Sequence, residues 1–199
     1  MRAVLVCVAL AACSPDISTG TYLCGAEQDC PEGQVCNGAD STCVIPSSAV
    51  PFACMAAAEA NEPDQDVAHA HQLGTLACVA PLLEITGCLA NGDKDDWYAF
   101  SIQAGCTSVS IDLGVASSYA FEPVTIDLAD ATGATVLATG STTCANTGKP
   151  EVTGEYKYCI TQMLAPSTAY TLHVKPTGDA TCGGSCAFNR YRLTATTSR

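Results

Sequence analysis

Carboxylates gather at one point of this chain, in the stretch from Asn91 to Phe100 (NGDKDDWYAF). Asp93, Asp95 and Asp96 stand directly before an aromatic run in which apolar side chains begin to alternate with others. The acidic half predicts a loop, and the aromatic half predicts the start of a strand that buries one face. Because hard cations are bound by carboxylate, amide and carbonyl oxygens, the stretch predicts an ion site at the start of a strand.

A second group of oxygen-bearing side chains precedes this stretch. It contributes acidic and amide groups from Glu59, Asn61, Glu62, Asp64 and Asp66, ahead of a short segment with spaced apolar residues. The two groups together could surround one cation. Solvated turn residues would have the same composition, and that interpretation stays open.

The net charge limits the choice of partners. The chain of 199 residues has 20 Asp and Glu against 8 Lys and Arg, which gives a net charge of -12. Negative charge repels nucleic acid and anionic lipid headgroups, so both are poor partners. A calcium-rich or basic target fits the charge better, although solubility alone would also explain it.

The N-terminus predicts export and a lipid anchor. Residues 1–12 place Arg2 before a short apolar run, far shorter than the about 20 residues of a membrane-spanning helix. The run ends in Leu-Ala-Ala before Cys13, which resembles a bacterial lipobox, so we expect Cys13 to carry palmitate and related acyl chains in a membrane. Ser14 at the next position favours the outer membrane or cell surface of a bacterial envelope. The alternative is an ordinary signal peptide that contains a cysteine.

The cysteine count predicts a disulfide framework. Of the 14 cysteines, Cys7 would leave with the signal peptide and Cys13 would carry lipid, and the even number that remains is typical of an exported disulfide-bonded protein. No CxxC pair occurs, which disfavours zinc and redox chemistry. The expected structural cysteines are Cys24, Cys30, Cys36, Cys43, Cys54, Cys78, Cys88, Cys106, Cys144, Cys159, Cys182 and Cys186. Their pairing stays open, although Cys144 and Cys159 could clip neighbouring strands and Cys182 and Cys186 could close a tight loop.

These features divide the chain into five parts. They are a signal peptide (1–12), a tether (13–23), a cysteine-rich module (24–43), a linker (44–58) and a C-terminal domain (59–199). The module has almost no apolar residues between its cysteines, so two disulfides must hold it. It resembles small cysteine-rich modules of secreted bacterial proteins, and it predicts either a binding knob or a protease-resistant spacer.

The C-terminal domain predicts an all-β fold. Short segments of alternating or β-branched residues recur between turn residues, as in a two-sheet antiparallel sandwich of about eight strands. The expected strands are Leu83–Leu89, Trp97–Ile102, Ser108–Leu113, Val124–Leu128, Thr135–Thr139, Tyr156–Met163, Tyr170–Lys175 and Tyr191–Thr196.

Five pieces of this domain resemble, in order, the bacterial pre-peptidase C-terminal domain. They are Glu62-Pro63-Asp64 with Ala70 and Leu73, Gly92-Asp93 with Asp96-Trp97-Tyr98 and Phe100, Val124 to Gly133, Leu164 to Val174, and Tyr191-Arg192-Leu193. The resemblance implies a jelly-roll-like β-sandwich of the kind appended to secreted proteases and other exported enzymes. The related collagen-binding domains of bacterial collagenases imply calcium, bound between the linker and the aspartates before the aromatic strand.

This resemblance also implies the calcium ligands. They are the linker residues Glu59, Asn61, Glu62, Asp64 and Asp66 and the loop residues Asp93 and Asp96. Two alignments of the linker motif are possible, and Glu59 takes the place of Asp64 in the second. Where the family often has Asn-Asp, this chain has Asp64-Gln65.

Catalytic patterns are missing from the sequence. The three histidines are His69 and His71 in the linker region and His173 inside an expected strand, and none belongs to a GxSxG, HExxH or phosphate-binding motif. The first two could bind a metal from an extended chain, but exposed linker histidines are the more common case. The sequence therefore predicts a protein that is not an enzyme.

The expected function is that of a surface lipoprotein that binds or stabilises. Its partners would be a membrane, through the lipid, and an extracellular protein or glycan, with calcium as the cofactor. The alternatives are an accessory domain that acts with a separate secreted protease, and a structural subunit of a surface complex.

Overall fold

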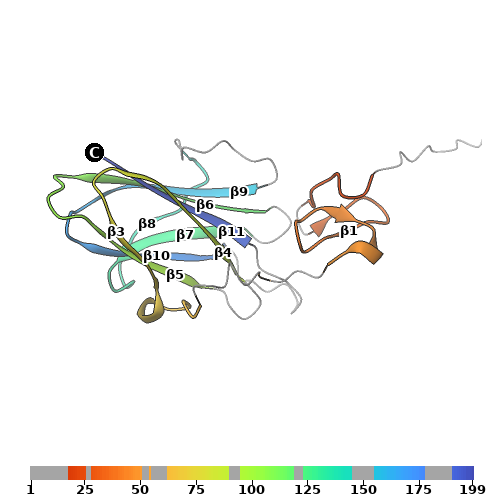
Figure 1. Ribbon diagram of the computed structural model, residues 1–199, viewed down its shortest axis with the longest axis horizontal. Coiled ribbons are helices and arrows are strands. Elements are labelled where there is room, and N and C mark those ends of the chain that lie inside the picture. The colour runs from red at the N-terminus through yellow and green to blue at the C-terminus, as the bar shows by residue number, and fades with distance from the viewer. Residues whose placement is uncertain are drawn as a thin grey trace, which may run out of the picture.

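The computed structural model describes residues 18–25, 28–50, 54, 62–89, 95–118, 123–144, 155–177 and 190–199 (Figure 1). The predictions for the signal peptide, Cys13, Glu59, Asn61, Asp93, Cys182 and Cys186 lie outside these residues. Among the residues that are described, none belongs to a helix with the length and apolar character needed to cross a membrane.

Strands dominate the described part of the chain. Two short 3₁₀ helices, η2 (Pro46–Ser48) and η3 (Val67–His69), accompany them. The strands are β1 (Val35–Cys36), β2 (Cys43–Val44), β3 (His71–Leu76), β4 (Ala80–Cys88), β5 (Asp96–Ile102), β6 (Val109–Ser118), β7 (Val124–Asp130), β8 (Val136–Thr139), β9 (Glu155–Leu164), β10 (Ala169–Pro176) and β11 (Arg190–Ser198).

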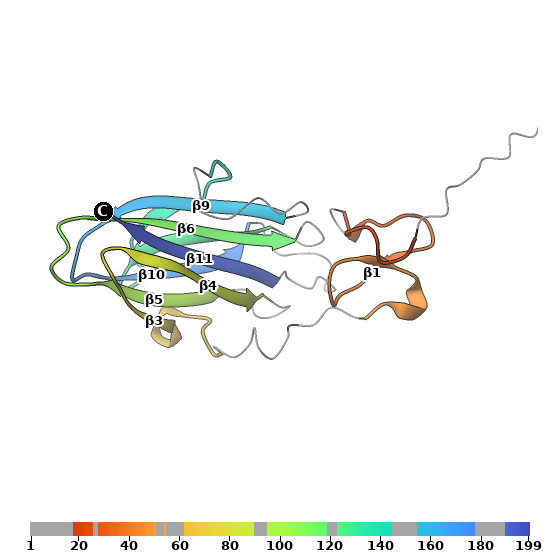
Figure 2. The same cartoon turned by 45° about the horizontal axis from the view of Figure 1, so that its top comes forward.

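Strands β3 to β11 form two sheets that face each other. One sheet has the order β3-β5-β10-β7-β8, and the other has the order β4-β11-β6-β9, whose strands lie side by side in Figure 2. If β4 is counted as the first strand, β4 to β11 have the orders 2-7-4-5 and 1-8-3-6. This is the strand order of a jelly roll, in which two antiparallel sheets enclose one core. The predicted jelly-roll-like β-sandwich is confirmed.

Strand β3 was not predicted, and it differs from the others in direction. It lies at the edge of its sheet and pairs in parallel with β5, whereas the other pairs are antiparallel. Its register shifts between Gln72 and Gly74, and Gly74 has a φ of 78°. A glycine in a bulge and exposed polar residues hide the alternation by which a strand is recognised in sequence.

The predicted strand that begins at Ser108 is longer than expected. It starts at Val109 but continues to Ser118, because Val115 and Ser117 carry the inward alternation past Gly114. The other predicted strands differ from the observed ones by only a few residues at their ends.

Alternation along β5 decides which aromatic rings enter the core. Tyr98 and Phe100 are buried, whereas Trp97 points to the outer face of its sheet. There it stacks on His173 of β10, with ring centroids 4.1 Å apart and an interplanar angle of 7°. Inward-facing side chains of both sheets, such as Leu172 and Leu193, complete a single apolar core.

Five disulfides connect the described cysteines. Two hold the cysteine-rich module, as predicted, one ties the linker to β4, and two lie within the sandwich. The pairs are Cys24–Cys36, Cys30–Cys43, Cys54–Cys88, Cys78–Cys106 and Cys144–Cys159. In both views of the chain, the module lies at one end of the sandwich (Figures 1 and 2).

Candidate metal centre

The candidate site lies where β5 begins. Asp96 is the first residue of β5, and its place in the alternation turns its side chain inward, where it is buried. The backbone N–H of Trp97 donates to the carbonyl oxygen of Asp64 at 2.8 Å. This hydrogen bond holds the segment before η3 against the start of the strand.

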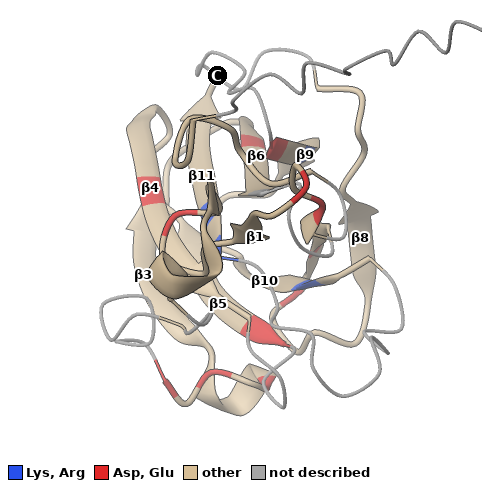
Figure 3. Cartoon of the chain, turned by 90° about the vertical axis from the view of Figure 1, so that its right-hand side faces the viewer, with Lys and Arg blue, Asp and Glu red and all other residues tan. Residues whose placement is uncertain are grey.

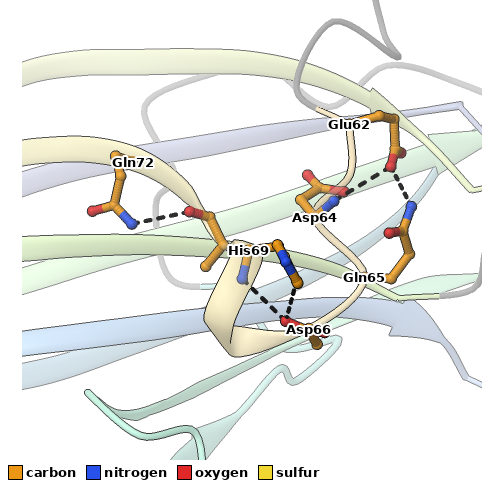
Figure 4. A network of polar contacts seen from close by, with 7 residues as sticks. Glu62, Asp64, Gln65, Asp66, His69 and Gln72 are labelled. Carbon is orange, nitrogen blue, oxygen red and sulfur yellow. Dashed lines mark hydrogen bonds and ion pairs between the residues drawn. The ribbon is translucent and has the colours of Figure 1, made fainter.

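Three carboxylates meet at this junction. One oxygen each of Glu62, Asp64 and Asp96 lies within 4.8 Å of the other two. Asp64 is 2% exposed and Asp96 is 3% exposed, while Glu62 is half-buried. Figure 4 shows Glu62 beside Asp64, whose backbone N–H donates to the Glu62 carboxylate at 3.3 Å, and the side-chain amide of Gln65 donates to the same oxygen.

Two tyrosine hydroxyls connect the carboxylates to the opposite sheet. The hydroxyl of Tyr191, on β11, donates to Oδ2 of Asp96. The Tyr98 hydroxyl lies 2.5 Å from the Tyr191 hydroxyl, so it must donate to Tyr191, whose own proton is already used. Gly87 of β4 makes room for this contact, because a Cβ there would lie 2.1 Å from the Tyr191 hydroxyl oxygen.

The negative charge of the site acts on both tyrosines. Burial raises the pKa of Tyr98 well above its ordinary value, and the charges of Asp96, Asp64 and Glu62 raise it further. Burial also raises the pKa of Tyr191, with Asp96 as the next largest cause. All three carboxylates are therefore within electrostatic reach of one buried hydroxyl.

The chemistry of this donor group suits a hard divalent cation. Like charges held close together in a poorly hydrated place repel, unless one takes up a proton or a cation binds between them. The group offers carboxylate oxygens and contains neither histidine nor cysteine, which favours calcium over zinc or copper. Calcium takes about six to eight oxygens at roughly 2.3–2.6 Å, so Glu62, Asp64 and Asp96 would form part of its shell.

Asp66, also expected as a ligand, is engaged elsewhere. Its Oδ1 accepts from the backbone N–H of His69 at 3.0 Å and lies 2.8 Å from the ring Nδ1 of His69, as Figure 4 shows. It thereby caps η3, and the hydrogen bond from the His69 side chain lowers the pKa of Asp66. The structure thus brings together three of the predicted ligands and places Asp66 beside them.

Asp95, the middle aspartate of the acidic loop, belongs to a different contact. Its Oδ1 lies 2.6 Å from Nε2 of His173 on the outer face of the sheet. Burial lowers the pKa of His173, although Asp95 opposes the shift. Among the hydrogen bonds of the described residues, His173 bonds this aspartate and no serine, threonine or cysteine, so no nucleophile accompanies the pair.

The other two histidines lie in different elements. His69 ends η3, and His71 begins β3, where its ring meets that of Tyr98 edge-on with centroids 6.0 Å apart. The short extended segment that would have placed both imidazoles on one side is therefore not formed.

Comparisons with known proteins gave matches among solved structures and not among family models or curated proteins. A scan against protein-family models found no match, and a search of curated proteins found none. Among solved structures, the chain is similar to the crystal structure of the pre-peptidase C-terminal domain of a collagenase from Bacillus anthracis. The two are 20% identical, the TM-score is 0.44, and the match covers 67% of this chain and 97% of that one. Strand order, rather than this similarity, identifies the jelly roll here.

Proposed function

We propose that this chain is a non-catalytic binding module, exported and lipid-anchored at Cys13, whose β-sandwich is stabilised by calcium. The observation that carries the proposal is the meeting of Glu62, Asp64 and Asp96, two of them almost fully buried, at the first residue of β5. The ligands of the calcium ion would also include Glu59, Asn61 and Asp93.

A cation at this place would join parts of the fold that are distant in sequence. Glu62 and Asp64 precede η3 and β3, and Asp96 begins β5. Tyr191 extends the connection from Asp96 to β11 in the other sheet. A ligand that binds only the folded state stabilises it by mass action, by about 2.7 kcal/mol at a hundred times its dissociation constant.

The proposal of a binding role rests on chemistry rather than on a recognised partner. In the described part of the chain, the Asp95–His173 pair has no serine, threonine or cysteine among its hydrogen-bonding partners, and Asp96 of the carboxylate group accepts from Tyr191. Sandwiches of this kind host many functions, so the partner class, an extracellular protein or glycan, is part of the proposal.

Thermal melting tests the calcium site. The mature protein should melt at a higher temperature in millimolar calcium than in chelator, and Asp64→Asn or Asp96→Asn should remove the rise. In chelator, Asp64→Asn should melt no lower than the wild type, because neutralising one of three adjacent carboxylates relieves their repulsion.

The matched control is Asp112→Asn. Asp112 lies on β6 and accepts from the Thr161 hydroxyl, away from the site, so this variant should keep the calcium response. Identical melting curves of the wild-type protein in calcium and in chelator would rule out the site.

Metabolic labelling tests the anchor separately. A palmitate analogue should label the wild-type chain in a bacterial host and fail to label Cys13→Ala, which should then leave the membrane fraction. Equal labelling of the two forms would show that Cys13 does not carry the lipid.

A further inference from the structure

The cysteine-rich module, taken from here on with its flanking segments as residues 18–50, exposes several large apolar side chains. The large hydrophobic residues exposed on it are Tyr22, Leu23, Val35, Ile45 and Val50, at 50%, 52%, 39%, 45% and 52%. The buried apolar cluster of the module consists of Cys24 and Cys43, with Cys30 and Cys36 packed against it. Disulfides hold the module, so folding does not require the exposed apolar residues.

The strand register places two of these residues, Leu23 and Val35, on one face together with the half-buried Val44. Val35 of β1 pairs with Val44 of β2, and Cys36 pairs with Cys43. Since successive side chains of a strand point to opposite faces, the buried Cys43 directs the valines outward. Leu23 bridges to Thr42, two residues before Val44, and therefore lies on the same outer face. We call this set, Leu23, Val35 and Val44 with Thr42 between them, the outer face of the module.

An acidic residue, Asp40, lies at the rim of this face beside Thr42. Oδ1 of Asp40 accepts from the backbone N–H of Thr42 at 3.1 Å and from its hydroxyl at 2.7 Å. The hydroxyl bond lowers the pKa of Asp40, which stays ionised at neutral pH. Residues 18–50 also contain Glu27, Asp29 and Glu32 and no Lys, Arg or His. Figure 3, which views the molecule from the module's side, marks the acidic residues in red.

Hydrogen bonds and one disulfide connect the module to the sandwich. The N–H of Gly38 donates to the carbonyl of Val50 at 2.8 Å, and the N–H of Val50 donates to Oδ1 of Asn37 at 2.9 Å. Only residues 51–53 separate Val50 from Cys54, which is bonded to Cys88 on β4.

A second contact joins the module to β11 of the sandwich. Arg190 of β11 lies opposite Cys88 in the sheet, and its guanidinium donates to the carbonyl of Gly38. A surface that is already ordered loses less entropy when a partner binds.

We propose that the outer face of the module docks a polypeptide segment whose apolar residues are flanked by Lys or Arg. The exposed Leu23 and Val35, with the half-buried Val44, would cover the apolar residues, and the ionised Asp40 at the rim would meet the cations. The proposal rests on the binding function given above and names the surface that performs it.

Selection from a library of short displayed peptides tests the proposal. The bait is the mature full chain in calcium, without its lipid. Enriched peptides should combine two or more apolar residues with flanking Lys or Arg. Their affinity should fall by about tenfold or more in Leu23→Ser or Val35→Ser. It should fall less in Asp40→Asn, which should also weaken the dependence of binding on salt.

A variant in the sandwich serves as the control for the peptide selection. Val136→Ser removes a side chain of similar exposure, 53%, from β8 and should leave binding unchanged. Failure to enrich any peptide, enrichment without basic residues, or undiminished binding by Leu23→Ser and Val35→Ser would overturn the proposal. Binding of the lipid-free chain to zwitterionic vesicles that is lost in Leu23→Ser would overturn it in favour of a lipid surface.

Two further measurements on the same samples distinguish failure of the docking proposal from failure of the calcium proposal and from misfolding of a variant. A calcium-dependent melting temperature without peptide binding would reject the docking face and leave the proposed calcium site standing. A count of free thiols by mass spectrometry shows whether each variant retains the disulfides of the module.

Discussion

In the cysteine-rich module, the buried apolar cluster is made of Cys24 and Cys43, whereas in the sandwich it is made of leucine, isoleucine, valine and tyrosine side chains from both sheets. The sandwich is stabilised mainly by removing apolar surface from water. The module has too few residues for that, and its disulfides act mainly by restricting the unfolded chain. Apolar side chains therefore build the core of the sandwich, whereas those of the module are not needed for a core and remain available to a partner.

The two regions also share one local motif. Asp40-Ser41-Thr42 and Asp130-Ala131-Thr132 have the same spacing, and in both the aspartate accepts from the threonine N–H and hydroxyl. The hydroxyl bond is the largest cause that lowers the pKa of each aspartate. Turn chemistry is thus common to both regions, and the difference lies in what supports the turns.

Truncation of a leucine should separate the regions most strongly. Leu193→Ala removes a side chain that is 1% exposed between the sheets and should lower the free energy of unfolding by about 2–5 kcal/mol. Leu23→Ala, at 52% exposure on the module, should change it by no more than about 0.5 kcal/mol. Denaturant unfolding measures both, and equal losses would contradict the assignment of stability to the sandwich core.

Removal of one disulfide from each region should affect the module more than the sandwich, unlike truncation of a leucine. Cys30 and Cys43 are 13 residues apart, and Cys144 and Cys159 are 15 apart, so the loops are of similar length. Cys30→Ser with Cys43→Ser should cost the module roughly 3 kcal/mol and expose the amides of residues 28–50 to hydrogen exchange. Cys144→Ser with Cys159→Ser should leave β9 protected, because β9 remains paired with β6. Loss of protection throughout the sandwich in the first variant would show that the regions unfold together.

A third pair of variants compares two glycines. A Cβ at Gly87 would lie 2.1 Å from the Tyr191 hydroxyl oxygen, so Gly87→Ala should destabilise the sandwich by about 1–3 kcal/mol and weaken its calcium response. A Cβ at Gly25 in the module meets its nearest atoms, those of Asp29, at an ordinary 3.6 Å, so Gly25→Ala should be tolerated. Melting curves with and without calcium measure both effects. If calcium raised the melting temperature of Gly87→Ala as much as that of the wild type, Tyr191 would have no part in the site.

The smallest effects should come from the shared aspartate motif and should depend on pH. The pKa of Asp130 is lowered to about 2 from 3.8, so its bonds contribute stability fully above pH 3.8 and lose it as the pH falls toward 2. Asp130→Asn should lower the melting temperature slightly at neutral pH, and the difference from wild type should shrink across this acid range. Asp40→Asn should show the same trend in the exchange of the Thr42 amide. A difference that grows on acidification would have the wrong sign.

Much of the sandwich could be predicted because its strands alternate plainly, as in Val109 to Leu113 and Tyr170 to Val174. Strand β3 could not, since its bulge at Gly74 and its parallel pairing with β5 depend on a contact made later in the chain. The length of β6 was underestimated because Gly114 resembles a strand end but continues the ladder opposite Cys159.

The acidic residues of the candidate site could be predicted from the sequence, but the tyrosine that contacts them could not. Glu62, Asp64 and Asp96 stand out as carboxylates before regular structure, but the contact of Asp96 with Tyr191 spans 95 residues and follows only from the pairing of the sheets. The capping role of Asp66 had a local signal, because an aspartate three residues before the end of a short helical turn is a common N-cap.

Calcium binding to the mature protein, measured by isothermal titration calorimetry, tests the central claim most directly. The account predicts a saturable site in the wild-type chain that is lost when Asp64→Asn and Asp96→Asn are combined and kept in Asp112→Asn. Absence of binding at millimolar calcium, or binding that survives the combined variant, would contradict it.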